Sequence, residues 1–215
     1  MRKLAYILTL MLALATQANA QEMRTIFTEM PDSIIPLLTY SNRADCVDFL
    51  DAKMKARVTN RLDGQSELLQ LTPDYLKMKL TKHTQLQMKL LPRSSGDTII
   101  CMVNTVCAEA NDSRVRFYTK EWKEITPATK MFKKPLTREF FAAGDSLNKI
   151  LQIADIYLVE LTLSPESATM QANYTTPAYM TRSDSAFVTK SMRPINYRWT
   201  GKTFEQTENN ILKIL

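Results

Sequence analysis

His83 is the only histidine in the chain, and it limits the catalytic chemistry that the sequence allows. A Ser-His-Asp or Cys-His mechanism would have to use this side chain as its base. It lies in the polar stretch Lys82-His83-Thr84 with no nucleophile beside it, which favours an exposed turn residue. One histidine and dispersed cysteines also disfavour a transition-metal site, because such sites need several clustered ligands. We therefore predict no catalytic residue of these types, no metal and no cofactor.

Three aspartates, Asp45, Asp48 and Asp51, recur at spacings of three and would share one face of a helix. Such a face could hold Ca²⁺, but no loop with oxygen ligands at alternating positions follows it. An acidic helix surface is therefore the favoured interpretation. Carboxylates that are distant in sequence can still pair in space, as in glycosidases, and the sequence leaves this alternative open.

The densest set of basic and aromatic side chains lies in the stretch DSRVRFYTKEW, residues 112–122. In a strand, Arg114, Arg116 and Tyr118 would point to one face, and the two apolar residues between them to the other. Arginine and tyrosine are enriched at protein interfaces, so we predict Arg114, Arg116 and Tyr118 as binding residues. The alternative is the solvated outer face of a sheet.

The three cysteines, Cys46, Cys101 and Cys107, are an odd number, so at least one thiol has no partner within the chain. Cys101 and Cys107 fall on one predicted strand, roughly 20 Å apart, which is too far for a disulfide. A disulfide between Cys46 and one of the others stays open. Small buried thiols in the core are favoured.

Four short segments place aspartate, a hydroxyl residue and an apolar residue in order: Asp32-Ser33-Ile34, Asp97-Thr98-Ile99, Asp145-Ser146-Leu147 and Asp184-Ser185-Ala186. This order resembles the O-glycosylation acceptor that Bacteroides-type bacteria use on exported proteins. Aspartate followed by serine is also ordinary at turns and helix caps. The sequence leaves open whether any of these hydroxyls is modified.

The first twenty residues have the pattern of a secretory signal peptide. Arg2 and Lys3 precede an apolar run over residues 4–16, and Ala18-Asn19-Ala20 matches a small-x-small cleavage site. The apolar run is well short of the ~20 residues that a spanning helix needs. We expect cleavage near Ala20 and a soluble product in the periplasm or outside the cell, without membrane insertion.

Charge and composition argue against nucleic acid as a partner and against a phosphate-binding loop. The formal net charge is +6, and it falls to +4 when Arg2 and Lys3 leave with the signal peptide. Because the basic residues are scattered rather than clustered, we predict no nucleic-acid binding. The chain has only 4 glycines in 215 residues, which argues against a glycine-rich phosphate loop.

Hydrophobic periodicity predicts one helix and then four antiparallel strands in the first half. Helical spacing covers residues 41–58, with Ser41 or Asn42 as the N-cap. The period then changes to two, which predicts strands over 75–81, 85–90 and 113–119, and the more apolar run 98–107 predicts a central strand.

The second half repeats this order less regularly. Helical patterns over 136–143 and 146–154 precede strand patterns over 157–163, 168–175, 185–191 and 194–200. We therefore predict an α+β fold in which a helix plus a four-stranded antiparallel sheet is repeated in tandem. The predicted units are residues 21–125 and 126–215. A single larger α+β domain is the alternative.

The first half resembles an uncharacterised secreted family, a domain of unknown function, of Bacteroidales. The matching phrases are MPDSIIPLLTYSNRADCVDFLDA, NRLDGQSELLQLTPDYL, MKLLP and TIICMVNTVCAEANDSRVRFYTKEW, which cover most of residues 30–125. The resemblance implies a periplasmic or surface protein, and it implies no activity and no catalytic residues. Tandem helix-plus-sheet units are also similar to the architecture of β-lactamase-inhibitor proteins, an analogy of fold that implies no inhibition.

Two functions from different classes follow from these observations. The favoured one is an exported, non-enzymatic binding or interaction module for an unidentified protein or envelope component, with Arg114, Arg116 and Tyr118 on its contact face. The alternative is a hydrolase of cell-envelope, glycan or peptide substrates that uses paired carboxylates, which only the expected compartment supports. The sequence does not indicate an oligomeric state.

Overall fold

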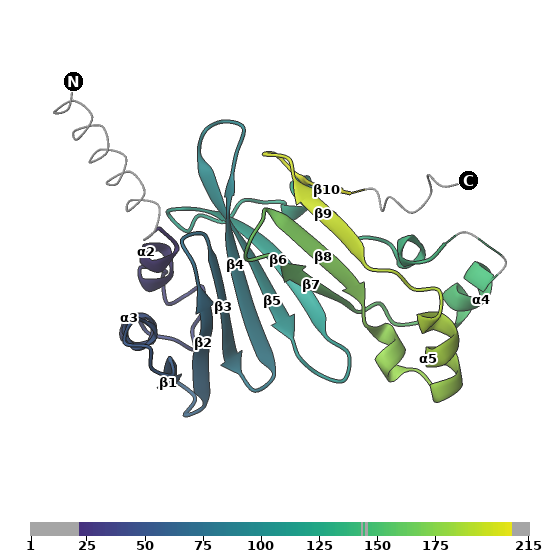
Figure 1. Cartoon of the computed structure of the whole chain (residues 1–215), viewed down its shortest axis with the longest axis horizontal. Coiled ribbons are helices and arrows are strands. Elements are labelled where there is room, and N and C mark those ends of the chain that lie inside the picture. The colour runs from purple at the N-terminus through teal and green to yellow at the C-terminus, as the bar shows by residue number, and fades with distance from the viewer. Residues whose placement is uncertain (1–21, 143, 145, 208–215) are drawn as a thin grey trace, which may run out of the picture. The chain divides into compact units, whose positions relative to one another are not determined.

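Four α-helices and ten strands make up the described part of the computed structural model, residues 22–142, 144 and 146–207. The predicted signal peptide and its cleavage site lie outside these residues. The chain divides into two compact units, Met1–Thr81 and Lys82–Leu215. Figure 1 labels the helices and strands of both units. The predicted helix-plus-sheet units, divided at residue 125, stay a prediction. Within the described residues, no helix has both the length and the apolar character needed to cross a membrane.

The first unit contains two helices beside a small antiparallel sheet. Its elements are α2 (Glu22–Thr28), α3 (Tyr40–Asp51), β1 (Arg57–Thr59), β2 (Gln65–Leu71) and β3 (Tyr75–Thr81). Strand β2 pairs with both β1 and β3, and its register with β3 shifts between Leu68 and Gln70. Leu76, Met78 and Leu80 of β3 are buried, as their alternation predicted.

Helix α3 is shorter than the sequence predicted. Its N-cap is Thr39, which precedes both predicted caps. Thr39 Oγ1 accepts a hydrogen bond from the Asn42 N–H, and Asn42 Oδ1 accepts one from the Thr39 N–H, both at 3.1 Å. The helix ends at Asp51, and Lys53 follows with a left-handed φ of 56°, a conformation that terminates helices. Residues 57–59 form β1, whereas the helix was predicted to continue to residue 58.

In the second unit, three consecutive strands pair as antiparallel neighbours: β4 (Thr84–Pro92), β5 (Thr98–Val106) and β6 (Asp112–Thr119). All three were predicted, β4 and β6 from their alternation and β5 from its continuous apolar run. Strand β4 differs from the prediction in one respect, because Gln87 and Lys89 on its polar side are each only 2% exposed. The strand β7 (Val159–Leu163) contacts β4, β5 and β6 and covers this side.

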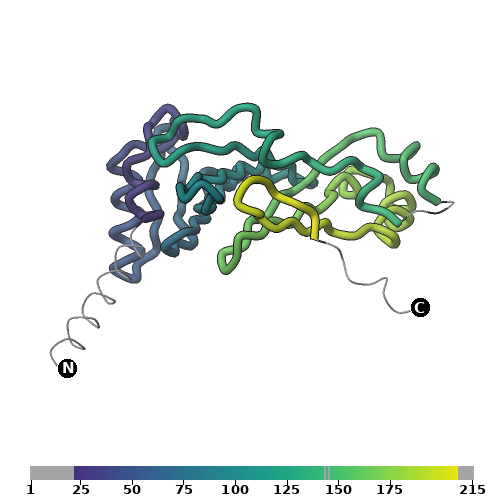
Figure 2. Tube along the Cα trace, turned by 90° about the horizontal axis from the view of Figure 1, so that it is seen from above, coloured from purple at the N-terminus to yellow at the C-terminus, as the bar shows by residue number. Residues whose placement is uncertain are grey.

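A four-stranded antiparallel sheet completes the second unit, in the order β10-β9-β8-β7. It consists of β7, β8 (Thr169–Tyr174), β9 (Ile195–Trp199) and β10 (Phe204–Gln206). Figure 2 shows the last two strands in yellow, where the chain turns back on itself. An α+β fold with antiparallel sheets is thus confirmed, and a four-stranded sheet is present. The tandem repeat stays a prediction.

Short helices connect these strands: η1 (Ala128–Lys130), η2 (Thr137–Phe140), α4 (Ser146–Ile153), η3 (Thr176–Tyr179) and α5 (Arg182–Thr189). The strand predicted over 185–191 is wrong, because α5 occupies most of it. Thr181 caps this helix by accepting a hydrogen bond from the Asp184 N–H at 3.3 Å, and Asp184 stabilises the positive end of the helix dipole. The few apolar residues of this segment fit both the helical period and the strand period, so the N-cap determines that a helix forms here.

Candidate binding surface at the edge of strand β6

Strand β6 carries the three predicted binding residues on one face but exposes only one of them. Arg114 is exposed, Arg116 is half-buried, and Tyr118 is 1% exposed. Their partners on β5 are, in order, Asn104, Met102 and Ile100. The expectation that Tyr118 faces solvent is therefore wrong, because its face of the sheet belongs to the core at that position.

Tyr118 and Arg116 are occupied by contacts within the protein. The Tyr118 ring lies 5.5 Å from the buried Trp122 ring, measured between centroids. Arg116 Nη1 donates a hydrogen bond to the Tyr118 hydroxyl at 3.4 Å. This hydrogen bond and the nearby Glu124 carboxylate raise the pKa of Arg116 above its ordinary value, so the guanidinium stays charged. Of the three predicted residues, only Arg114 has an exposed side chain without a partner, and Arg116 is half-buried but keeps its positive charge.

The outer edge of β6, which faces away from β5, forms hydrogen bonds on both sides of Val115. Ser113 O accepts a hydrogen bond from Lys134 Nζ at 3.4 Å, and Phe117 O accepts one from the Ile125 N–H at 2.8 Å. Backbone groups of alternate residues point to the same edge of a strand, so the N–H and C=O of Val115 point there too. Neither group forms a hydrogen bond with any residue that the structure describes. The edge is thus open at Val115.

A hollow of about 370 Å³ adjoins this open edge. Residues 112–115 of β6 form one wall, and the opposite wall contains Ala128, Thr129 and Lys134. Phe132 and Leu161, both buried, contribute apolar surface together with the half-buried Val115. The volume lies in the range of about 300–1,000 Å³ that is common for ligand sites.

Two cations and one carboxylate line the hollow. Lys134 Nζ donates a hydrogen bond to Asp112 Oδ1 at 2.8 Å and lies 5.2 Å from the centre of the Tyr157 ring. The Arg114 side chain forms no hydrogen bond or ion pair with another residue in the described part of the chain. The hollow therefore combines apolar walls and one ion pair, and the uncompensated positive charge of Arg114 lies beside it, on the other face of β6.

A comparison with protein-family models identifies the family to which the chain belongs. The model of the family described as "Protein of unknown function (DUF3256)" matches residues 15–204. The chain belongs to this family. The resemblance to a family of unknown function is thereby confirmed. No curated protein matches the DUF3256 chain.

A solved structure shows the same fold as this DUF3256 chain. It is the structure of a domain of an uncharacterized protein from Porphyromonas gingivalis W83, with a TM-score of 0.75 and 24% sequence identity. The match covers 86% of this chain and 99% of the Porphyromonas chain.

Outside the hollow, the reactive side chains that the structure describes lie in separate places. His83 is exposed in its turn, as predicted, and its Nδ1 lies 3.3 Å from Cys107 O. The cysteines are free thiols, and burial raises the pKa of Cys46 to about 11. Asp51 pairs with Arg24, and this hydrogen bond lowers its pKa. Within the described residues, no group of three or more His, Cys, Asp or Glu could hold a metal.

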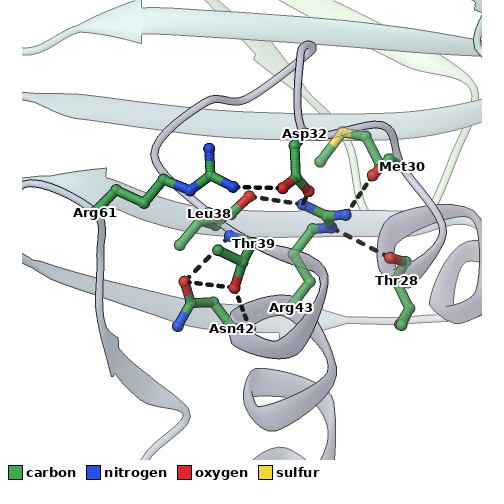
Figure 3. Close-up of polar contacts among 8 residues, drawn as sticks. All are labelled: Thr28, Met30, Asp32, Leu38, Thr39, Asn42, Arg43 and Arg61. Carbon is green, nitrogen blue, oxygen red and sulfur yellow. Dashed lines mark hydrogen bonds and ion pairs between the residues drawn. The ribbon is translucent and has the colours of Figure 1, made fainter.

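A buried arginine in the first unit has a structural role (Figure 3). The guanidinium of Arg43 donates to four oxygens, namely the carbonyls of Thr28, Met30 and Leu38 and Oδ1 of Asp32. Arg61 pairs with the other oxygen of Asp32 at 2.6 Å. Because Arg43 is 1% exposed and its acceptors come from residues 28–38, it ties this irregular segment to α3.

The four aspartate-hydroxyl segments occupy different settings. Ser33 is exposed in a turn, and Ser146 is exposed at the first position of α4. Thr98 and Ser185 are half-buried within β5 and α5. Asp145 lies outside the described residues. Only Ser33 and Ser146 therefore have exposed side chains among the four hydroxyl residues.

Sequence reasoning missed the far wall of the hollow, residues 128–134. No regular period marks this segment, and it received no predicted element. A weak signal exists, because Pro127 and Pro135 bracket a basic stretch that contains the single aromatic residue Phe132. Only the tertiary structure shows that this stretch lies across from Arg114.

Proposed function

We propose that this DUF3256 protein is an exported, non-enzymatic interaction module that binds a protein partner at the hollow beside β6. One observation carries the proposal: the unpaired, exposed Arg114 lies at an apolar hollow next to an open strand edge. Apolar surface supplies binding energy through burial, and a rim cation supplies selectivity for acidic partners. Export is supported by the pattern of residues 1–20.

The contents of the hollow argue against the hydrolase alternative at this site. Among the described residues that line it, Asp112 is the only carboxylate. Its Oδ1 accepts hydrogen bonds from Lys134 Nζ at 2.8 Å and from the Val159 N–H at 3.1 Å. A paired-carboxylate mechanism needs a second acid across from the first, and no described residue supplies one in the hollow.

A capture experiment tests the proposed function. The chain from residue 21 onward is immobilised and exposed to a cell-envelope extract of a Bacteroidales bacterium. We expect wild type and Arg114→Lys to retain a partner protein, and Arg114→Glu to reduce its capture by about tenfold or more, because the rim charge is reversed. Arg182→Glu, on the exposed start of α5, is the matched control and should behave as wild type. Equal capture by Arg114→Glu would overturn the assignment of this surface.

A further inference from the structure

We infer that the partner enters as an extended segment that adds a strand to β6 at Val115, with the pattern acidic–apolar–acidic. This inference rests on the proposed function and specifies the chemistry of the partner. It follows from three features of the described residues: the open backbone groups of Val115, the apolar hollow next to them, and the charge of Arg114.

At the outer edge of β6, the backbone can pair with one residue of a partner strand. Both hydrogen-bonding groups of Val115 point to the outer edge, so one antiparallel residue could exchange two hydrogen bonds with it. On either side the edge is closed, by Lys134 at Ser113 O and by Ile125 at Phe117 O. The paired stretch is therefore short, and its register is set by Val115.

Side-chain alternation then gives the sequence pattern of the partner. A residue directly opposite Val115 points its side chain to the same face as Val115, toward the hollow with Leu161 and Phe132. An apolar side chain suits that position. Its two neighbours point to the opposite face of β6, which carries Arg114 and Arg116. Acidic side chains suit those two positions, because they lie opposite cations.

A second copy of the same strand does not suit this edge. Antiparallel pairing of two β6 strands about Val115 would place Arg114 of each copy opposite Arg116 of the other. Like charges directly opposite each other destabilise a strand pair. A small free anion would engage Arg114 but would leave the apolar walls and the backbone groups of Val115 unused. An acidic, extended segment of a different protein satisfies all three features.

Selection from a phage-displayed library of random heptapeptides on the immobilised wild-type chain tests the inference. We expect enrichment of a central large apolar residue flanked by aspartate or glutamate. A synthetic version of the best heptapeptide should bind Arg114→Glu about tenfold or more weakly, and it should bind the Arg182→Glu control as it binds wild type.

Backbone methylation of the peptide separates strand pairing from simple charge attraction. N-methylation of the central apolar residue removes the donor to Val115 O and should weaken binding about tenfold or more. The same methylation one residue further along alters an amide that points away from β6 and should have a much smaller effect. Peptides without the acidic–apolar–acidic pattern, or equal effects of the two methylations, would overturn the inference. If Arg114-dependent capture from the extract persisted in that case, the proposed function would stand. If that capture were absent, the proposed function itself would fail.

Discussion

The side chain of Gln87 on β4 accepts, through Oε1, a hydrogen bond from the backbone N–H of Leu163 on β7 at 2.9 Å. The same relationship recurs along β7, where the Leu161 N–H donates to Ser113 Oγ at 2.9 Å and the Val159 N–H donates to Asp112 Oδ1 at 3.1 Å. Strand β7 is the edge of its sheet, so its outward N–H groups have no strand partner. Polar side chains on the face of β4–β6 satisfy them, which accounts for burial of polar residues on that face.

Replacement of Gln87 by methionine should destabilise the protein. Methionine has a similar size and supplies no comparable acceptor, so the buried Leu163 N–H would lose its partner. We expect a loss of about 1–3 kcal/mol in the free energy of unfolding, measured by urea denaturation. Gln70→Met, at an exposed position of β2, is the control and should change stability by less than about 0.5 kcal/mol. A Gln87→Met protein as stable as the control would show that the side-chain hydrogen bond contributes nothing.

Replacement of Arg43 by lysine should also destabilise the protein, although the charge is kept. An ammonium group cannot reach the four oxygens that surround the guanidinium, so buried carbonyls would lose their donors. The expected loss is about 2–4 kcal/mol in the free energy of unfolding. Arg61→Lys alters the half-exposed partner of the same Asp32 and should cost at most about 1 kcal/mol. Similar losses for the two variants would contradict the assigned role of Arg43.

Stability should fall as the pH rises above about 8.5, the ordinary pKa of a cysteine thiol. Burial raises the pKa of Cys46 to about 11 and raises that of Cys101 as well, so both thiols stay protonated in the folded protein. The unfolded chain loses these protons first, and the difference favours unfolding. Each thiol should reduce stability by up to about 1.4 kcal/mol per pH unit, between pH 8.5 and the folded pKa.

Urea denaturation at pH 7.0 and pH 9.5 measures this effect. The stabilisation from the two protonated thiols is fully present below pH 8.5 and is lost as the pH rises. The double variant Cys46→Ala/Cys101→Ala should be less stable at neutral pH and should show a smaller decrease between the two pH values. An unchanged decrease in the double variant would assign the pH dependence to other groups.

Local alternation was enough to predict the strands that contain Tyr75–Thr81 and Asp112–Thr119, and a short apolar run predicted the one that contains Thr98–Val106. A strand with one apolar side has a strict period of two, which is visible in the sequence alone. The same reasoning failed for α5, where a cap outweighs an ambiguous short run of apolar residues. It also misjudged Gln87 and Tyr118, because the burial of an alternating polar side depends on what packs against it. Among the candidate site residues, Arg114 was predicted, whereas Phe132 and Lys134 were not.

The sequence by itself determined the α+β character, the strand β6 and the basic character of its Arg114–Tyr118 face, because these depend on the spacing of neighbouring residues. Only the tertiary structure decided which of those residues are accessible. It covers Tyr118 and half-buries Arg116 in the sheet, and it leaves Arg114 exposed beside a hollow whose other wall comes from residues 128–134. Such walls depend on contacts between segments that are far apart in the chain. Those contacts cannot be predicted from the spacing of residues within one segment.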